Sequence, residues 1–262
     1  MTTRIQMIDS FYNEIDEDLR LNKSRHGQLE YLTTMACIHR YAAPGAKLLE
    51  IGAGTGRYSI ALAKEGYEVT ALELVERNLQ VLQHNGGHLP NLTAHQGDAL
   101  DLSRFADASF DVTLLFGPMY HLYEPADVHR ALDEAIRVTR PGGVILTAFL
   151  SVYAIMSNCY LNEGFLEGLR ENFTEDHTVR HYEEQLFTGY DIVEFEQLFA
   201  GKPVQRLTTM AADGVLELAR GRSDFSLTDE AFAALAKLHL ATCEKRELLG
   251  MSSHLVHVGR KL

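Results

Sequence analysis

Residues 48–73 read LLEIGAGTGRYSIALAKEGYEVTALE, and this stretch decides the fold. Two short β-rich runs, KLLEIG and EVTALE, enclose a helical run at 58–64. Gly52, Gly54 and Gly56 lie where the first strand ends and the helix begins. Strands that alternate with helices over such short distances predict a parallel sheet with right-handed crossovers.

The glycine loop and the acid at the end of the next strand predict a ligand that contains ribose. A loop without side chains lets a ligand approach the backbone, and the helix after it presents unpaired N–H groups. Glu73 lies 21 residues after Gly52, where a carboxylate can accept both ribose hydroxyls. A dinucleotide prefers G-x-G-x-x-G, whereas here the third glycine comes one residue early and Arg57 takes its slot. S-adenosylmethionine, which has no phosphate, is the second ligand class that fits.

The same alternation continues outward from the loop. LTAHQGD, FDVTLLFG and VILTAFL are further strands, and DVHRALDEAIRVT is an amphipathic helix ended by RPGG. VQRLTTMAADGVL and SSHLVHVGRKL are predicted as the last strands. The resulting organisation is a helical N-terminal cap at 1–43, an α/β core at 44–150, a helical or irregular lid insertion at 151–200, and completion of the core at 201–262, all in one domain.

Composition narrows the functional class. The chain has 262 residues and a formal net charge of −12, which argues against a nucleic-acid substrate. The longest apolar run is shorter than the roughly 20 residues that cross a bilayer, and the N-terminus lacks the pattern of a signal peptide. Three widely spaced cysteines predict reduced thiols and a cytoplasmic location.

At these motifs the chain resembles the class I S-adenosylmethionine-dependent methyltransferases. The matching segments are LLEIGAGTGRYS, ALE at 71–73, GDALDL at 97–102, FDVTLLFGPMYHL at 110–122 and RPGGVIL at 140–146, in that family's order. The resemblance implies an α/β fold with a doubly wound, mostly parallel seven-stranded sheet. It also implies S-adenosylmethionine as cofactor, S-adenosylhomocysteine as product, and methyl transfer by in-line displacement.

The resemblance also assigns roles to the residues that match. Glu50 fixes the loop from behind, and the methionine portion of the cofactor is flanked by Gly52, Ala53, Gly54 and Arg57. Glu73 holds the ribose and Leu74 contacts the adenine, whose amine and ring are read by Asp98 and the backbone of Ala99. Phe116 and Gly117 lie at the mouth where the methyl group emerges.

The segment FGPMYHLYEP, residues 116–125, should face the methyl acceptor. Only Pro118 and Tyr120 match the Asn/Asp-Pro-Pro-Tyr motif of amino-group methyltransferases, which favours a small-molecule acceptor over protein or RNA. Tyr120 and His121 are the candidate catalytic residues, with His121 as a base near neutral pH. Packing is the alternative role for both. Residues expected to close over the cofactor are Tyr12, Arg20, Arg25 and His26.

We predict no metal site from the histidine pattern. The pairs His84–His88 and His177–His181 have helical spacing but lack a supporting motif, and His254 and His257 should point to opposite faces of a strand. Three alternatives to a small-molecule methyltransferase remain open at this point: an NAD(P)-dependent oxidoreductase, a methyltransferase of protein or RNA, and a cofactor-binding protein without enzymatic activity.

Overall fold

The structure is a computed structural model that describes residues 3–14, 21, 24–161, 163–182, 185–219, 222 and 224–262. Within these residues the chain forms an eight-stranded sheet with the order β3-β2-β1-β4-β5-β8-β7, and β6 pairs with β5. The strands are β1 (Lys47–Ile51), β2 (Glu68–Glu73), β3 (Leu92–Gln96), β4 (Phe110–Leu115), β5 (Thr139–Ser151), β6 (Gly189–Tyr190), β7 (Val204–Ala211) and β8 (His254–Lys261). Arg20 lies outside the described residues.

Strand directions confirm the predicted doubly wound, mostly parallel sheet. Strands β3, β2, β1, β4 and β5 pair in parallel, as does β6 with β5. Strand β8 runs antiparallel to both β5 and β7. The sequence does not predict β6, because a strand of two residues carries no periodicity.

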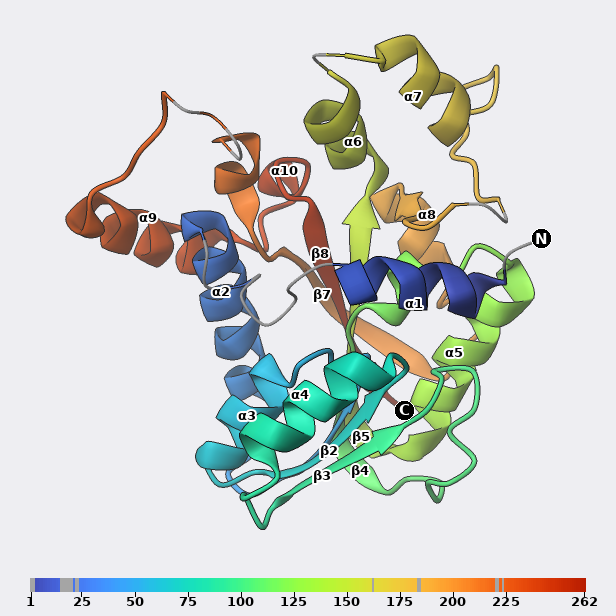
Figure 1. The fold of residues 1–262 in the computed structure, drawn as a ribbon, viewed down its shortest axis with the longest axis vertical. Coiled ribbons are helices and arrows are strands. Elements are labelled where there is room, and N and C mark those ends of the chain that lie inside the picture. Colours follow the sequence, from blue (N-terminus) through green and yellow to red (C-terminus); the bar gives the residue numbers. More distant parts are fainter. Residues whose placement is uncertain are drawn as a thin grey trace.

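Helices cover both faces of the sheet, as Figure 1 shows, with α2, α3 and α4 on one side and α5 and α8 on the other. The helices are α1 (Arg4–Glu14), α2 (Arg25–Tyr41), α3 (Arg57–Lys64), α4 (Glu76–Gly86), α5 (Pro125–Val138), α6 (Val152–Ile155), α7 (Phe165–Asn172), α8 (Ile192–Gln197), α9 (Asp229–Thr242) and α10 (Arg246–Leu249). Leu48 packs in the core on the α2 and α3 side, and its neighbour Leu49 packs on the α5 side. Burial on both faces explains why these strands read as continuous apolar runs.

Two segments differ from the sequence prediction. Strand β5 begins at Thr139, before the glycine pair, because that end of the strand already pairs with Phe110 on β4. The strand predicted from Val204 ends at Ala211, and a 3-10 helix, η4 (Gly214–Ala219), follows it. No helix in the described ranges combines the length and apolar character that crossing a membrane requires.

Helix α1 and the segment of α6 and α7 lie near the carboxyl ends of the parallel strands (Figure 1). Arg4 at the start of α1 pairs with Asp98, which follows β3, and Tyr12 near its end contacts His121, which follows β4. Helix α1 therefore bridges the loops after two different strands. These loops form the candidate site.

Candidate functional site

The glycine loop joins β1 to α3 and packs against the loop that follows β4. Gly52 has a φ of +80°, and a Cβ there would lie 2.7 Å from Pro118 Cδ and closer still to the Phe116 carbonyl oxygen. Gly56 also has a positive φ, +86°, and is the N-cap of α3. A side chain at Gly52 would therefore separate the two loops, and glycine keeps them in contact. Both loops line a cavity of about 1040 Å³.

Glu73 ends β2 with its carboxylate in the same cavity. Its Oε2 accepts a hydrogen bond from the Gly54 N–H at 2.7 Å, and its Oε1 accepts one from the Val75 N–H at 2.9 Å. The residue is only 5% exposed. Each carboxylate oxygen has two lone pairs and can accept more than one hydrogen bond. Glu73 thus braces the glycine loop in addition to the binding role expected of it.

Glu50 lies behind the loop in the sheet. Its carboxylate accepts a hydrogen bond from the Ser59 hydroxyl and so ties β1 to α3. Burial raises the pKa of Glu50 to about 8, and the nearby charge of Glu73 adds to the effect. Its role in fixing the loop stays a prediction.

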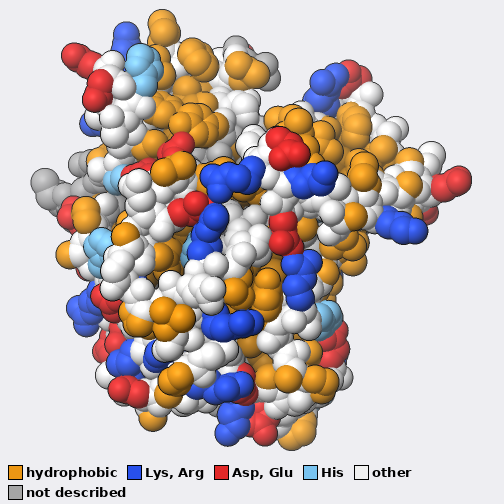
Figure 2. All heavy atoms as spheres, turned by 180° about the vertical axis from the view of Figure 1, so that it is seen from behind, with side chains coloured by type: hydrophobic (Ala, Val, Ile, Leu, Met, Phe, Trp, Pro, Cys, Tyr) orange, Lys and Arg blue, Asp and Glu red, His pale blue; other side chains and the backbone are white. Residues whose placement is uncertain are grey.

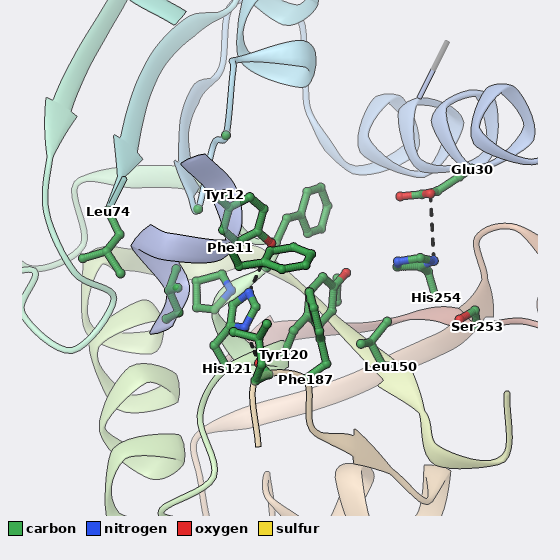
Figure 3. A pocket seen from close by; sticks show the side chains of 18 of the residues that line it. Phe11, Tyr12, Glu30, Leu74, Tyr120, His121, Leu150, Phe187, Ser253 and His254 are labelled. Atoms are coloured by element: carbon green, nitrogen blue, oxygen red, sulfur yellow. Dashed lines mark hydrogen bonds and ion pairs between the residues drawn. The ribbon is translucent and has the colours of Figure 1, made fainter. Parts of the chain in front are cut away.

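The predicted adenine end is partly engaged by the protein itself. Asp98 Oδ1 accepts a hydrogen bond from the Leu100 N–H at 3.1 Å, and Oδ2 pairs with the Arg4 guanidinium of α1. Both side chains of that ion pair are mostly buried. Leu74 lines this part of the cavity (Figure 3). Asp98 thus lies in the cavity wall under α1, and its contact with an adenine amine stays a prediction.

The remaining predicted cofactor residues also line the cavity, namely Ala53, Arg57, Ala99, Phe116 and Gly117. The Arg57 guanidinium lies 5.0 Å from the ring centre of Tyr31, which holds it at the cavity wall. The structure thus brings all eleven predicted cofactor residues around one cavity. Which part of S-adenosylmethionine each of these residues contacts stays a prediction.

His121, predicted as a base, is buried and hydrogen-bonded at both ring nitrogens. Nδ1 donates to the Leu186 carbonyl at 2.6 Å, which leaves Nε2 to accept from the Tyr12 hydroxyl at 3.2 Å. Burial lowers the pKa of His121 to about 4, and the charge of Arg4 adds to the effect. The imidazole is therefore neutral at pH 7 and a weaker base than the sequence suggests.

Aromatic side chains surround His121 and Tyr120 (Figure 3). The Phe187 ring lies 4.9 Å from the His121 ring and 5.1 Å from the ring of Phe11. The Tyr120 ring also lies beside the ring of His254, in an edge-to-face contact at 5.8 Å. These side chains give the acceptor side of the cavity an apolar wall with a few polar atoms.

The sequence analysis misses most of a polar cluster on the side of the cavity away from Leu74 (Figure 3). Asp213 Oδ2 contacts His26 Nε2 at 2.9 Å and His254 Nδ1 at 2.7 Å. Glu30 lies 3.9 Å from His254 Nδ1, and Glu217 pairs with His26. The spacing of four between His26 and Glu30, and between Asp213 and Glu217, is the only local signal of this cluster.

The cluster has strongly shifted titration. Burial opposes the charged form of His26, but hydrogen bonds to Asp213 and Glu217 overcome it and raise the pKa of His26 to about 9. Burial likewise opposes ionisation of Asp213, but its bonds to His254 and His26 hold the pKa of that carboxyl well below its usual range.

Of the other residues expected to close over the cofactor, Tyr12 and His26 line the cavity, whereas Arg25 pairs with Asp229 instead.

Residues 49–147 match a family model described as a methyltransferase domain. Among curated proteins, a demethylmenaquinone methyltransferase of Renibacterium salmoninarum is 40% identical over 111 residues, 42% of this chain and 44% of its own length. The enzyme of the same name from Staphylococcus haemolyticus is 32% identical over 148 residues, 55% of this chain and 58% of its own length. The chain therefore aligns with about half the length of these relatives.

Solved structures share the fold over nearly the whole chain. A methyltransferase of Thermotoga maritima, described as a possible histamine N-methyltransferase, has a TM-score of 0.63 at 17% identity and covers 99% of this chain and 100% of its own. A Burkholderia thailandensis 1,6-didemethyltoxoflavin-N1-methyltransferase, solved with S-adenosylhomocysteine, has a TM-score of 0.59 at 16% identity, with 98% and 86% covered. The cyclase SpnF has a TM-score of 0.51 at 18% identity, with 88% and 81% covered.

Proposed function

We propose that this chain, whose residues 49–147 match a methyltransferase domain, is a class I S-adenosylmethionine-dependent enzyme that transfers a methyl group to a small-molecule acceptor. One observation carries the proposal: the glycine loop and Glu73 open directly into the same cavity that Tyr120 and His121 line. Cofactor and acceptor can therefore meet inside one enclosure of about 1040 Å³. That volume is at the upper end of ordinary ligand pockets, which hold roughly 300–1,000 Å³.

The residues of the chain mainly orient the reactants and exclude water. When bound, S-adenosylmethionine supplies an electrophilic methyl group on a sulfonium sulfur. Glu73 and Asp98 hold the nucleoside, while Phe116 and Gly117 direct the methyl group toward the acceptor. Good orientation alone contributes roughly 7–11 kcal/mol of barrier reduction, so the reaction does not require a strong base.

Tyr120 and His121 remain the proposed acceptor-side residues. With a pKa of about 4, His121 is better suited to hold the Tyr12 hydroxyl than to keep a proton. Its Nδ1 bond to the Leu186 carbonyl fixes the tautomer in which Nε2 accepts. We therefore assign His121 the task of positioning Tyr12 and the acceptor.

Demethylmenaquinone is the first acceptor to test. Two relatives carry this substrate in their names, and the apolar wall formed by Phe11, Phe187 and Tyr120 suits a largely apolar ring system. On the face that Figure 2 shows, Lys and Arg are interspersed with Asp and Glu, which supports a small molecule over RNA. The methyltransferase domain match removes the support for an NAD(P)-dependent oxidoreductase.

The rest of the chain completes the proposal. We assign residues 1–43 and 151–200 to a cover over the core formed by 44–150 and 201–262, in a single domain. Tyr160 and Glu171, from the second of these covering segments, line the cavity. Cys37, Cys159 and Cys243 are free thiols, which supports a cytoplasmic location.

Isothermal titration with S-adenosylhomocysteine, NAD and NADP tests the cofactor, and transfer of a labelled methyl group tests the activity. We expect micromolar binding of S-adenosylhomocysteine, no binding of the nicotinamide cofactors, and methylation of demethylmenaquinone. Methylation of another metabolite would replace the acceptor and keep the activity. Failure to bind S-adenosylhomocysteine would overturn the proposal, and binding without transfer across a broad panel would favour a cofactor-binding protein without methyltransferase activity, since one fold supports different functions.

A further inference from the structure

Two histidines and two carboxylates converge on one wall of the cavity, and neither the domain nor the relatives' names assign them a role. The four residues are His26 and Glu30 of α2, Asp213 between β7 and η4, and His254, the first residue of β8. Glu30 and Asp213 are 5% and 0% exposed. The side chains of His26 and His254 are 11% and 15% exposed. We call this set the His–carboxylate cluster.

Helix spacing and strand pairing together bring the members of the cluster to one place. His26 and Glu30 are four residues apart in a helix, so their side chains share one face of α2. Antiparallel pairing of Ala211 with Leu255 brings the end of β7 beside the start of β8. Asp213 then accepts hydrogen bonds from the Ser252 hydroxyl and from the Ser253 N–H at 3.0 Å. Such outer bonds are the kind that orient metal ligands in proteins.

Distances within the cluster match the shell of a single ion. In octahedral coordination, an ion held at about 2.1 Å has adjacent ligand atoms about 3.0 Å apart and opposite ligand atoms about 4.2 Å apart. Asp213 Oδ2 lies 2.9 Å from His26 Nε2 and 2.7 Å from His254 Nδ1, which are adjacent spacings. Glu30 Oε2 lies 3.9 Å from His254 Nδ1, near the opposite spacing. All four donor atoms lie within 4.8 Å of one another.

We propose that the His–carboxylate cluster binds one divalent first-row transition-metal ion. Imidazole nitrogen combined with carboxylate oxygen is the donor set of zinc, iron, cobalt and manganese sites. Glu30, Asp213 and the neighbouring Glu217 bring three carboxylates into a buried region. Buried carboxylates are costly unless positive charge balances them. A divalent ion bound by the two neutral imidazoles would bring two positive charges in place of the imidazolium that pairs with Asp213 and Glu217.

The position of the cluster also suggests what the ion does, and this part rests on the proposed function. The His254 ring lies 5.8 Å from the Tyr120 ring, on the acceptor side of the cavity. An acceptor hydroxyl bound to the ion would lose its proton to solvent more readily. The resulting oxyanion would be a better nucleophile, or would activate the ring that carries it.

The test uses the full chain, stripped of metal with a chelator and dialysed. Zn²⁺ titration by calorimetry and Co²⁺ titration by visible absorption should each show one ion bound per chain. We expect His26→Ala and His254→Ala to weaken Zn²⁺ binding by roughly 100-fold or more, since even outer-shell changes cost 10–100-fold. His26→Gln, which keeps a polar group toward Asp213, should lose the ion with less effect on folding. His129→Ala, which removes an exposed histidine of α5, is the matched control.

Two outcomes would overturn the metal site: no stoichiometric Zn²⁺ or Co²⁺ binding by the wild-type chain, or variants that bind as tightly as wild type. If the cluster has only a structural role, the variants should melt at a lower temperature than wild type, and Zn²⁺ should not raise the melting temperature of wild type. That result would also contradict the metal site. Binding of S-adenosylhomocysteine, measured on the same samples, separates the two proposals. Glu73→Ala should bind S-adenosylhomocysteine at least tenfold more weakly and keep its affinity for Zn²⁺. Wild type that binds Zn²⁺ but not S-adenosylhomocysteine would overturn the proposed function alone.

Discussion

Glu73 shows how one carboxylate can serve the loop and the ligand together. Its hydrogen bonds to the Gly54 and Val75 N–H groups hold the loops after β1 and β2 in register. The same carboxylate faces the cavity where a ribose would lie. Sequence reasoning finds this residue because glycine loop and acid lie within one strand-helix-strand unit, at a spacing that the fold requires. Its bracing role is visible only in three dimensions.

We predict that Glu73→Ala lowers the affinity for S-adenosylhomocysteine at least tenfold. A hydrogen bond to a charged group contributes roughly 1.5–3 kcal/mol, and 1.4 kcal/mol corresponds to a factor of ten. Isothermal titration measures the effect. Glu68→Ala, at the exposed start of the same strand, is the control and should bind as wild type. Unchanged affinity in Glu73→Ala would remove its assigned contact with ribose.

The His–carboxylate cluster marks where residue-level prediction ends. Its members come from α2, from the turn after β7 and from β8, so more than 180 residues separate His26 from Asp213. No local pattern can report that these segments meet. The spacing of His254 and His257 does predict opposite faces correctly, since His254 lines the cavity and His257 is buried against Phe199. The direction and register of β8 in the sheet decide which of these two histidines points into the site.

At the scale of elements, the contact between two loops decides the geometry of the site. Gly52 lies against the Phe116 carbonyl and the Pro118 ring. We predict that Gly52→Ala weakens S-adenosylhomocysteine binding and lowers the free energy of unfolding by roughly 1–3 kcal/mol, from its positive φ and the forced separation of the loops. Gly45→Ala is the matched control, because Gly45 also has a positive φ but has no atom within 4 Å of the added Cβ. Gly45→Ala should lose stability but bind S-adenosylhomocysteine as wild type does. Equal affinities in the two variants would contradict the assigned role of the contact between the loops.

Helix α1 acts, in our proposal, as a cover over the cofactor. Arg4 pairs with Asp98, and the pair is mostly buried. We predict that Arg4→Ala speeds dissociation of S-adenosylhomocysteine about fivefold, because losing a partly buried pair costs on the order of 1 kcal/mol. Stopped-flow displacement measures the rate. Arg130→Ala, an exposed arginine on α5, should leave it unchanged. Slower dissociation in Arg4→Ala would show that Arg4 competes with the cofactor for Asp98.

The βα units of the core could be predicted because each leaves a local mark. Near-continuous apolar runs mark strands β1 and β4, and the glycine loop marks the first crossover. Between residues 151 and 200 these marks fail, since that segment contains helices of four to eight residues and the two-residue strand β6. Such short elements owe their structure to tertiary contacts rather than to propensity. The 3-10 helix η4 could not be predicted for the same reason, and neither could the position of Glu217 in it.

At the scale of the whole molecule, two buried neutral histidines make stability depend on pH. His121 is in the cavity wall, and His257 lies on the opposite face of the sheet with its ring stacked on Phe199 at 4.0 Å. Among the described residues, neither ring nitrogen of His257 has a hydrogen-bond partner. Burial lowers the pKa of His257 to about 3, and the charge of Arg206 adds to the effect. The folded pKa thus lies below the unfolded value, near 6.5.

Below pH 6.5 the unfolded chain binds a proton at His257 that the folded chain does not bind. The free energy of unfolding is therefore highest, as far as His257 is concerned, above pH 6.5, and it falls as the pH is lowered toward 3. Between pH 7 and pH 5 we expect His257 to lower the free energy of unfolding of wild type by roughly 2 kcal/mol. We predict that His257→Phe lacks this decrease. Urea unfolding at both pH values measures it, with His129→Ala as control. An identical pH dependence in His257→Phe and wild type would contradict this assignment.

The reach of α1 has a consequence for how donor and acceptor sense each other. Arg4 and Tyr12 are eight residues apart, or about 12 Å along one helix, and they hold Asp98 and His121. A rigid helix that shifts at one end shifts at the other, so adenine docking and acceptor docking bias the same element. Thermodynamic reciprocity then requires each molecule to change the affinity of the other by the same factor. We expect synergy between the two halves of the reaction, carried by a segment that takes no part in the chemistry.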